Sequence, residues 1–350
     1  MIHVFIPDFN FQNCSLIEAF DWTADLGICI APIAQRYFSI VENPEEADWV
    51  VIPAFTTQLL HPRGEKLLTS SVELAKRIQK PLALFSNSDF ILSPSNANAF
   101  VFTPGAYKSN PFQIDIPATF DQDPFEKWNF GHWEPAPHSQ KPSIGFCGQA
   151  TRNPLKALKD AMTFSKARLR KQLGYSHSDS GPIFLPAWER ARLLEVFEKD
   201  GRFQTDFVLR TKYKGGATSE EQKRQVEREF FENIYSNLFT VCMRGMGNYS
   251  VRFYQTLAMG RIPVLIDTDY SVAFNAFHQL ESLIPVIPYA QKNHAAEMTF
   301  EYFAGKNAEE LIHIQKQCRL IWEAYFQKEG LIKYLAKSME AIQSSYRCLK

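Results

Sequence analysis

Residues 238–267 decide the fold, and their sequence is LFTVCMRGMGNYSVRFYQTLAMGRIPVLID. The pattern predicts a short apolar strand, a glycine-containing turn, a helix that begins near Tyr249 or Ser250, and a buried strand over 262–266. This order is that of a βαβ unit, in which a helix joins two parallel strands. The turn should therefore present backbone N–H groups at a helix N-terminus, where they and the helix dipole favour a phosphate.

Two arginines flank this turn, Arg244 before it and Arg252 after it. Guanidinium groups form paired, charge-assisted hydrogen bonds with phosphate oxygens, so two of them beside a helix N-terminus suit a diphosphate. We expect a nucleotide diphosphate here. The residues predicted to bind it around the turn are Arg244, Gly245, Gly247, Asn248, Tyr249, Ser250 and Arg252.

The same segment resembles a known family. The motifs NLFTVCMRG at 237–245 and YSVRFYQTLAMGRIPVLIDTD at 249–269 are similar to those of the exostosin-like glycosyltransferases of family 47. Weaker similarities occur over most of the chain, at 44–53 (PEEADWVVIP), 141–148 (KPSIGFCG) and 205–210 (TDFVLR).

The resemblance implies an α/β protein of GT-B architecture, with two Rossmann-like domains and a cleft between them. It also implies inverting transfer of a sugar from a nucleotide sugar, a UDP-sugar by family resemblance, to a glycan hydroxyl, as in polysaccharide biosynthesis. The sequence departs from the family at Gln255, where the family has a glutamate for the ribose. An amide accepts such hydrogen bonds more weakly than a carboxylate. A glycan-binding or scaffolding protein with an inactive transferase fold therefore remains an alternative.

Two other chemistries fit residues 245–269. The motif GMGNYS at 245–250 approximates a dinucleotide-binding fingerprint with Asp267 as the ribose ligand, which would indicate an NAD-dependent oxidoreductase, but Ser250 replaces its last glycine. Asp267 and Asp269 form a DxD motif that could share a metal with a diphosphate. Because aspartates that follow a strand commonly form turns, and the arginines already supply positive charge, we favour the turn and expect no metal or cofactor.

A third cation and two carboxylates follow other predicted strands. Arg210 ends the strand predicted over 207–209, where it either joins the phosphate site or forms a surface ion pair. An inverting transferase also needs a general base for the acceptor hydroxyl. Asp8, after the strand 3–6, and Asp89, in the polar loop SNSD at 86–89, are the candidates, and each could instead be a turn residue. We favour Asp89.

The length of 350 residues favours two domains. As the resemblance implies, we expect an acceptor-side domain over 1–135, a nucleotide-sugar domain over 142–305 and a helical segment over 306–350 that packs back on the first domain. In the first domain the pattern predicts strands at 3–6, 49–52 and 82–85 and a helix at 66–79. In the second it predicts a strand at 143–146 and helices at 154–173, 186–199 and 219–235.

Composition excludes several other classes of protein. Lysine plus arginine equals aspartate plus glutamate at 38 each, so the net charge of zero does not favour nucleic-acid binding. The six cysteines lack the spacing of disulfide frameworks or zinc sites. Since no apolar run reaches the ~20 residues that a membrane span requires, we expect a cytoplasmic protein without an integral membrane segment.

Overall fold

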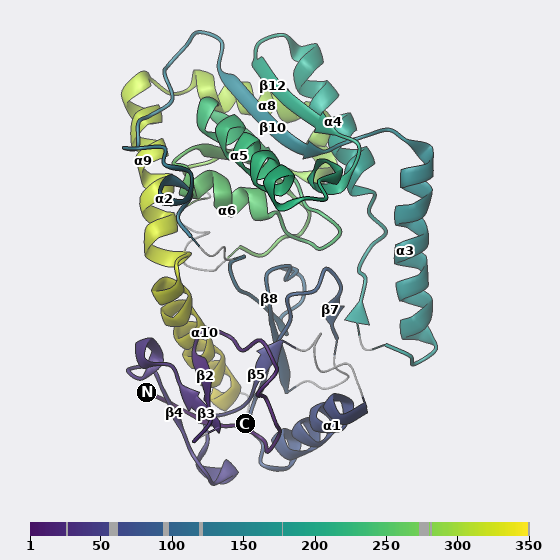
Figure 1. Cartoon of the computed structure of the whole chain (residues 1–350), viewed down its shortest axis with the longest axis vertical. Helices are drawn as coiled ribbons and strands as arrows, with labels where there is room; N and C mark the ends of the chain where they lie inside the picture. Colours follow the sequence, from purple (N-terminus) through teal and green to yellow (C-terminus); the bar gives the residue numbers. More distant parts are fainter. Residues whose placement is uncertain are drawn as a thin grey trace.

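The computed structural model describes residues 1–25, 27–55, 62–93, 98–118, 122–176, 178–272, 280 and 282–348. Two parallel sheets dominate it and lie one above the other along the long axis of the molecule (Figure 1).

Within the described residues, the first sheet has six strands in the order β4-β1-β5-β6-β8-β9, and all neighbours pair in parallel. The strands are β1 (Ile2–Phe5), β4 (Phe38–Ile40), β5 (Trp49–Phe55), β6 (Leu82–Phe85), β8 (Ala99–Thr103) and β9 (Gln113–Asp115). Helix α1 (Pro62–Arg77) connects β5 to β6, and β2 (Phe20–Thr23) and β3 (Gly27–Ile30) form a separate antiparallel pair. Since β5, β6 and β8 are almost entirely buried, they carry continuous apolar runs.

The second sheet has five described strands in the order β12-β10-β13-β14-β15, again all parallel. They are β10 (Ser143–Gln149), β12 (Gln204–Arg210), β13 (Phe239–Cys242), β14 (Ile262–Asp267) and β15 (Val286–Pro288). The helices of this half are α2 (Pro124–Trp128), α3 (Pro154–Gln172), α4 (Pro186–Asp200), α5 (Glu220–Ser236), α6 (Val251–Ala258), α8 (Ala295–Ala304) and α9 (Ala308–Tyr325). The predicted βαβ unit is β13-α6-β14.

The two C-terminal helices belong to different cores. Helix α9 buries Leu311, Cys318 and Trp322 in the core of the second sheet. Helix α10 (Lys328–Cys348) instead places Ile332, Leu335 and Met339 in the core of the first sheet. The chain therefore returns to the first domain at its end, and Figure 1 shows α10 descending from α9 alongside β2 and β5.

Several contacts dock the two domains on each other. Strand β7 (Ile91–Leu92) of the first half pairs antiparallel with β11 (Ser178–Asp179) of the second. The Lys108 ammonium donates to the Asp267 carboxylate at 2.7 Å, and Tyr107 forms an isolated bridge with Tyr270. The loop after β8 therefore packs against the carboxyl end of β14.

These observations confirm the α/β class with two parallel sheets, whereas the GT-B architecture remains a prediction. The predicted elements agree with the structure except at their ends. Helix α1, predicted from residue 66, begins at Pro62, because proline is favoured in the first turn, where a backbone N–H is not needed. The boundaries proposed at 135 and 142 remain a prediction. Among the described residues, no helix is both long and apolar enough to span a bilayer.

Candidate active site

The glycine turn, residues 243–250, connects the end of β13 to the start of α6. The Gly245 N–H donates to the Tyr249 carbonyl at 3.1 Å, which closes the turn on itself. The Gly247 N–H points instead to the first domain and donates to the Asp89 carboxylate at 3.0 Å. A Cβ atom at Gly247 would lie 2.6 Å from the Tyr249 ring and 2.9 Å from Asp89, so only glycine permits this approach.

The buried Arg244 side chain holds the glycine turn together by hydrogen bonds to its backbone carbonyls. It is 4% exposed, and its guanidinium donates to the carbonyls of Met246 at 2.9 Å and Gly247 at 3.2 Å. It also donates to the Tyr107 hydroxyl of the first domain at 3.2 Å, and it lies over the Phe184 ring at 4.8 Å. The predicted position of Arg244 at the turn agrees with the structure, but several of its donors already have protein partners.

Arg252 lies on α6 and contacts different groups. It is 8% exposed, donates to the Cys147 carbonyl at the end of β10 at 2.9 Å, and stacks over the Phe146 ring at 4.1 Å. Its Nε has no hydrogen-bond partner among the described residues. Burial lowers the pKa of Arg252, and the nearby charge of Arg210 lowers it further. A buried guanidinium with an unused donor is costly without an anion, and this favours an anionic ligand.

Gly148 provides the space that Arg252 occupies, because a Cβ atom there would lie 2.6 Å from the Arg252 Nη2. Arg210 ends β12 beside the same strand and forms an ion pair with Glu229 on α5. Its guanidinium also donates to the Val226 carbonyl at 3.2 Å. The ion-pair alternative for Arg210 is therefore present in the structure, while its role toward a diphosphate remains a prediction.

The polar residues around the turn have distinct positions. The Asn248 amide donates to the Asp269 carbonyl at 3.2 Å and accepts from the Thr268 hydroxyl at 2.8 Å, which ties the turn to the end of β14. Ser250 is the N-cap residue of α6, although its side chain does not accept a capping hydrogen bond. Gln255 is half-buried on the same helix.

The DxD motif forms a turn and a domain contact. Asp267 accepts from the Tyr270 N–H at 2.9 Å as well as from Lys108, and Asp269 has a left-handed backbone with φ of +65°. The Asp269 carboxylate also accepts from the Ser109 hydroxyl. In the described part of the chain, no group of three or more His, Cys, Asp or Glu residues is arranged to hold a metal. The arrangement agrees with the turn interpretation.

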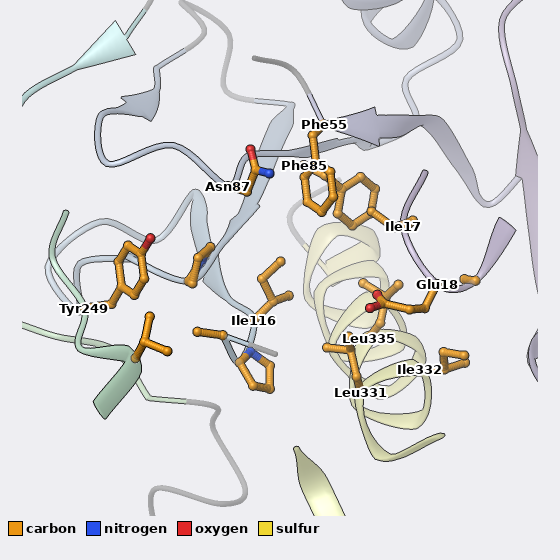
Figure 2. A pocket seen from close by; sticks show the side chains of 15 residues that line it. Ile17, Glu18, Phe55, Phe85, Asn87, Ile116, Tyr249, Leu331, Ile332 and Leu335 are labelled. Atoms are coloured by element: carbon orange, nitrogen blue, oxygen red, sulfur yellow. The ribbon is translucent and has the colours of Figure 1, made fainter. Parts of the chain in front are cut away.

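A pocket of about 330 Å³ lies between the two domains (Figure 2). Phe55, Phe85 and Pro104 line it from the carboxyl ends of β5, β6 and β8. Tyr249 and Val251 line it from the start of α6. Leu331, Ile332 and Leu335 line it from the first turns of α10.

Most of the pocket lining is apolar, and Glu18 and Asn87 supply polar side chains. Figure 2 shows the Glu18 carboxylate pointing across the pocket toward Leu335 of α10. Of the two predicted bases, Asp89 contacts the glycine turn, and Asp8 is exposed after β1. The described residues that line the pocket include neither of them.

Sequence reasoning missed Glu18, Asn87 and Arg190. Glu18 lies in the long connection after β1, far from the strand end where a base was sought. Asn87 belongs to the polar loop at 86–89 that was identified only for Asp89. Arg190 on α4 donates to the carbonyls of Met243 at 3.1 Å and Arg244 at 3.0 Å, so it supports the turn from a distant helix. No local motif marks such a residue.

Comparison with protein-family models and with curated protein sequences finds no match. Among solved structures, the chain is similar to a GtfA/B complex, with a TM-score of 0.37, 10% identity and coverage of 85% of this chain. It is also similar to the pneumococcal O-GlcNAc transferase GtfA in complex with UDP and GlcNAc, with a TM-score of 0.32, 13% identity and 86% coverage. The chain spans 57% of the length of each.

Proposed function

We propose that the protein is an inverting glycosyltransferase. It moves the sugar of a UDP-sugar to a hydroxyl of a saccharide-bearing acceptor. The observation that carries the proposal is the position of the pocket. It lies between the carboxyl edge of the first sheet and the start of α6, next to the glycine turn. In doubly wound α/β proteins, ligands bind at the carboxyl ends of the strands.

The donor would bind on the second domain. Arg244 at the turn, and Arg252, whose buried Nε has no hydrogen-bond partner in the described part of the chain, would neutralise the diphosphate as the sugar leaves. The residues proposed for donor binding remain those predicted from the sequence: Arg210, Arg244, Gly245, Gly247, Asn248, Tyr249, Ser250, Arg252 and Gln255. The resemblance to family 47 is part of this proposal.

The acceptor would bind in the pocket on the first domain, where Phe55, Phe85 and Tyr249 offer aromatic surfaces for a sugar ring. The acceptor hydroxyl gives its proton to a carboxylate, and its oxygen forms a bond to C1 of the donor sugar. The bond from C1 to the diphosphate oxygen breaks, and its electron pair leaves with the diphosphate. One such displacement inverts C1. Glu18, which lines the pocket, is the base that the geometry supports best.

Calorimetric titration with UDP, GDP, UMP and NAD in the presence of EDTA tests the donor site. Tighter binding of UDP than of UMP is expected, because the second phosphate adds charge-assisted hydrogen bonds. Selective NAD binding would instead indicate an oxidoreductase. UDP binding without transfer to any saccharide, over a panel of UDP-sugars, would indicate a binding protein with an inactive transferase fold.

Three matched variants test the base. Glu18→Gln is expected to abolish transfer while UDP affinity stays unchanged, because the carboxylate acts on the acceptor alone. Asp8→Asn and Asp89→Asn are the comparison variants. Loss of turnover in Asp89→Asn, with Glu18→Gln active, would return the role of base to Asp89.

A further inference from the structure

Helix α3 exposes large apolar side chains along one face, interrupted in the middle by the exposed polar residues Ser165 and Lys166. This apolar row consists of Leu155, Leu158, Met162, Leu169 and the C-cap residue Leu173, which are between 55% and 74% exposed. Successive members are three, four, seven and four residues apart, so they lie on one face of the helix. Several large apolar side chains exposed on one helix face commonly mark a binding surface.

The apolar row faces away from the protein. Phe164 lies on the opposite face of the helix and is fully buried. It packs against the Phe90 ring of the first domain, with the ring centroids 5.4 Å apart. Asp160 lies on the same inner side, where it is buried and paired with Lys156. Figure 1 shows α3 along one lateral edge of the molecule, beside both sheets.

A row of cations runs beside the apolar row. Lys159, Lys166 and Arg170 are exposed, are seven and four residues apart, and have no ion-pair partner among the described residues. Residues 154–173 contain six basic side chains and one acidic one, a net charge of +5, whereas the whole chain has a net charge of zero. Positive charge is thus concentrated on the helix that carries the apolar row.

We propose that α3 binds the surface of an anionic lipid bilayer, with its axis in the membrane plane. The apolar row inserts at the boundary between headgroups and acyl chains, and the cation row contacts lipid phosphates. A second copy of the chain would place two helices of the same charge face to face, which is unfavourable. An anionic bilayer complements both the apolar row and the charge. This inference is independent of the proposed function.

Vesicle co-sedimentation of the full chain tests the proposal. Vesicles of phosphatidylglycerol and phosphatidylcholine are expected to bind the protein at low salt, whereas vesicles of phosphatidylcholine alone bind it much less. Raising the salt should weaken the binding, because exposed charges are screened. Absence of binding to the anionic vesicles at low salt would overturn the proposal.

Three variants assign the binding to α3. The triple change Leu158→Ser, Met162→Ser and Leu169→Ser and the triple change Lys159→Glu, Lys166→Glu and Arg170→Glu should each weaken partitioning about tenfold or more. All six side chains are exposed, so the fold should survive, which circular dichroism checks. The matched control, Ile312→Ser with Leu320→Ser, removes two exposed apolar side chains of α9 and should bind normally.

Two results would contradict this assignment. Binding to anionic vesicles that is unchanged in both α3 variants would place the lipid contact elsewhere. Concentration-dependent dimerisation without lipid, lost in the serine variant, would make a second copy the partner of the apolar row. Sedimentation velocity of the parent and the serine variant separates this outcome from membrane binding.

Discussion

The Asp89 carboxylate of the first domain accepts a hydrogen bond from the Gly247 N–H of the second domain at 3.0 Å. The N–H that the sequence assigned to a phosphate thus already binds an anion, which is supplied by the opposite domain. Carboxylate and phosphate groups are both oxyanions, so the same backbone N–H groups of a turn can bind either. The contact also places Asp89, the base that the sequence favoured, beside the proposed donor site.

Asp89→Asn is therefore expected to bind UDP more tightly than the parent. The substitution removes a negative charge beside the proposed diphosphate site, and two unit charges ~4 Å apart interact by about 1 kcal/mol in bulk water and by more near a protein surface. Isothermal titration gives the dissociation constant. Unchanged affinity combined with a large loss of turnover would instead identify Asp89 as the base.

Replacing Arg244 or Arg252 by methionine should weaken UDP binding by ~1.5–3 kcal/mol, because each guanidinium would form charge-assisted hydrogen bonds with the diphosphate. Methionine keeps much of the buried apolar volume, which limits damage to the core. Arg202→Met is the control, since Arg202 pairs with Asp200 away from the turn. If both site variants melt as the parent does and bind UDP equally well, the donor site lies elsewhere.

Gln255→Glu should preserve or tighten UDP binding if this side chain contacts the ribose, because a carboxylate accepts hydroxyl hydrogen bonds more strongly than an amide. Gln255→Leu should weaken it by roughly 1–3 kcal/mol by leaving a hydroxyl unpaired. Titration of both variants gives the answer. A UDP affinity that neither change alters would show that Gln255 does not contact the nucleotide.

Chelation should leave UDP binding and transfer unchanged, because Asp267 is paired with Lys108 and Asp269 with Ser109. Asp267→Asn should cost about 0–1 kcal/mol of stability, as expected for a partly exposed ion pair. Activity assays with EDTA, and then with added Mn²⁺, provide the measurement. Activity that is lost in EDTA and restored by Mn²⁺ would support the DxD metal site.

Burial raises the pKa of the Cys242 thiol to about 12. At pH 8 only about one molecule in ten thousand would carry the reactive thiolate, so Cys242 should resist iodoacetamide in the folded protein. The folded state prefers the neutral thiol. The stability that this preference contributes is therefore fully present below the unfolded pKa of about 8.5, and it is lost as the pH rises from there through the folded pKa. Peptide mass spectrometry, with half-buried Cys29 as the internal comparison, measures the labelling. Rapid native labelling of Cys242 would show that it is accessible.

The local sequence was sufficient to predict the βαβ unit at 238–267. Its two strands are continuous apolar runs, and the glycines and Ser250 mark the turn and the helix start, so periodicity and turn chemistry act over a few residues. The helices at 154–173 and 186–199 were predictable for the same reason. The α/β class with two parallel sheets follows from the alternation of such elements along the chain.

Tertiary structure alone decided which side chains meet. Glu18, Tyr249 and Leu335 line one pocket although they are far apart in the sequence, because the carboxyl edge of the first sheet, the start of α6 and the returning helix α10 converge there. Arg244 and Arg252, predicted to act as a pair, contact different groups because α6 turns Arg252 toward the Phe146 ring. Spacing along the chain determines which face of an element a residue occupies, whereas packing between distant elements determines what that face contacts.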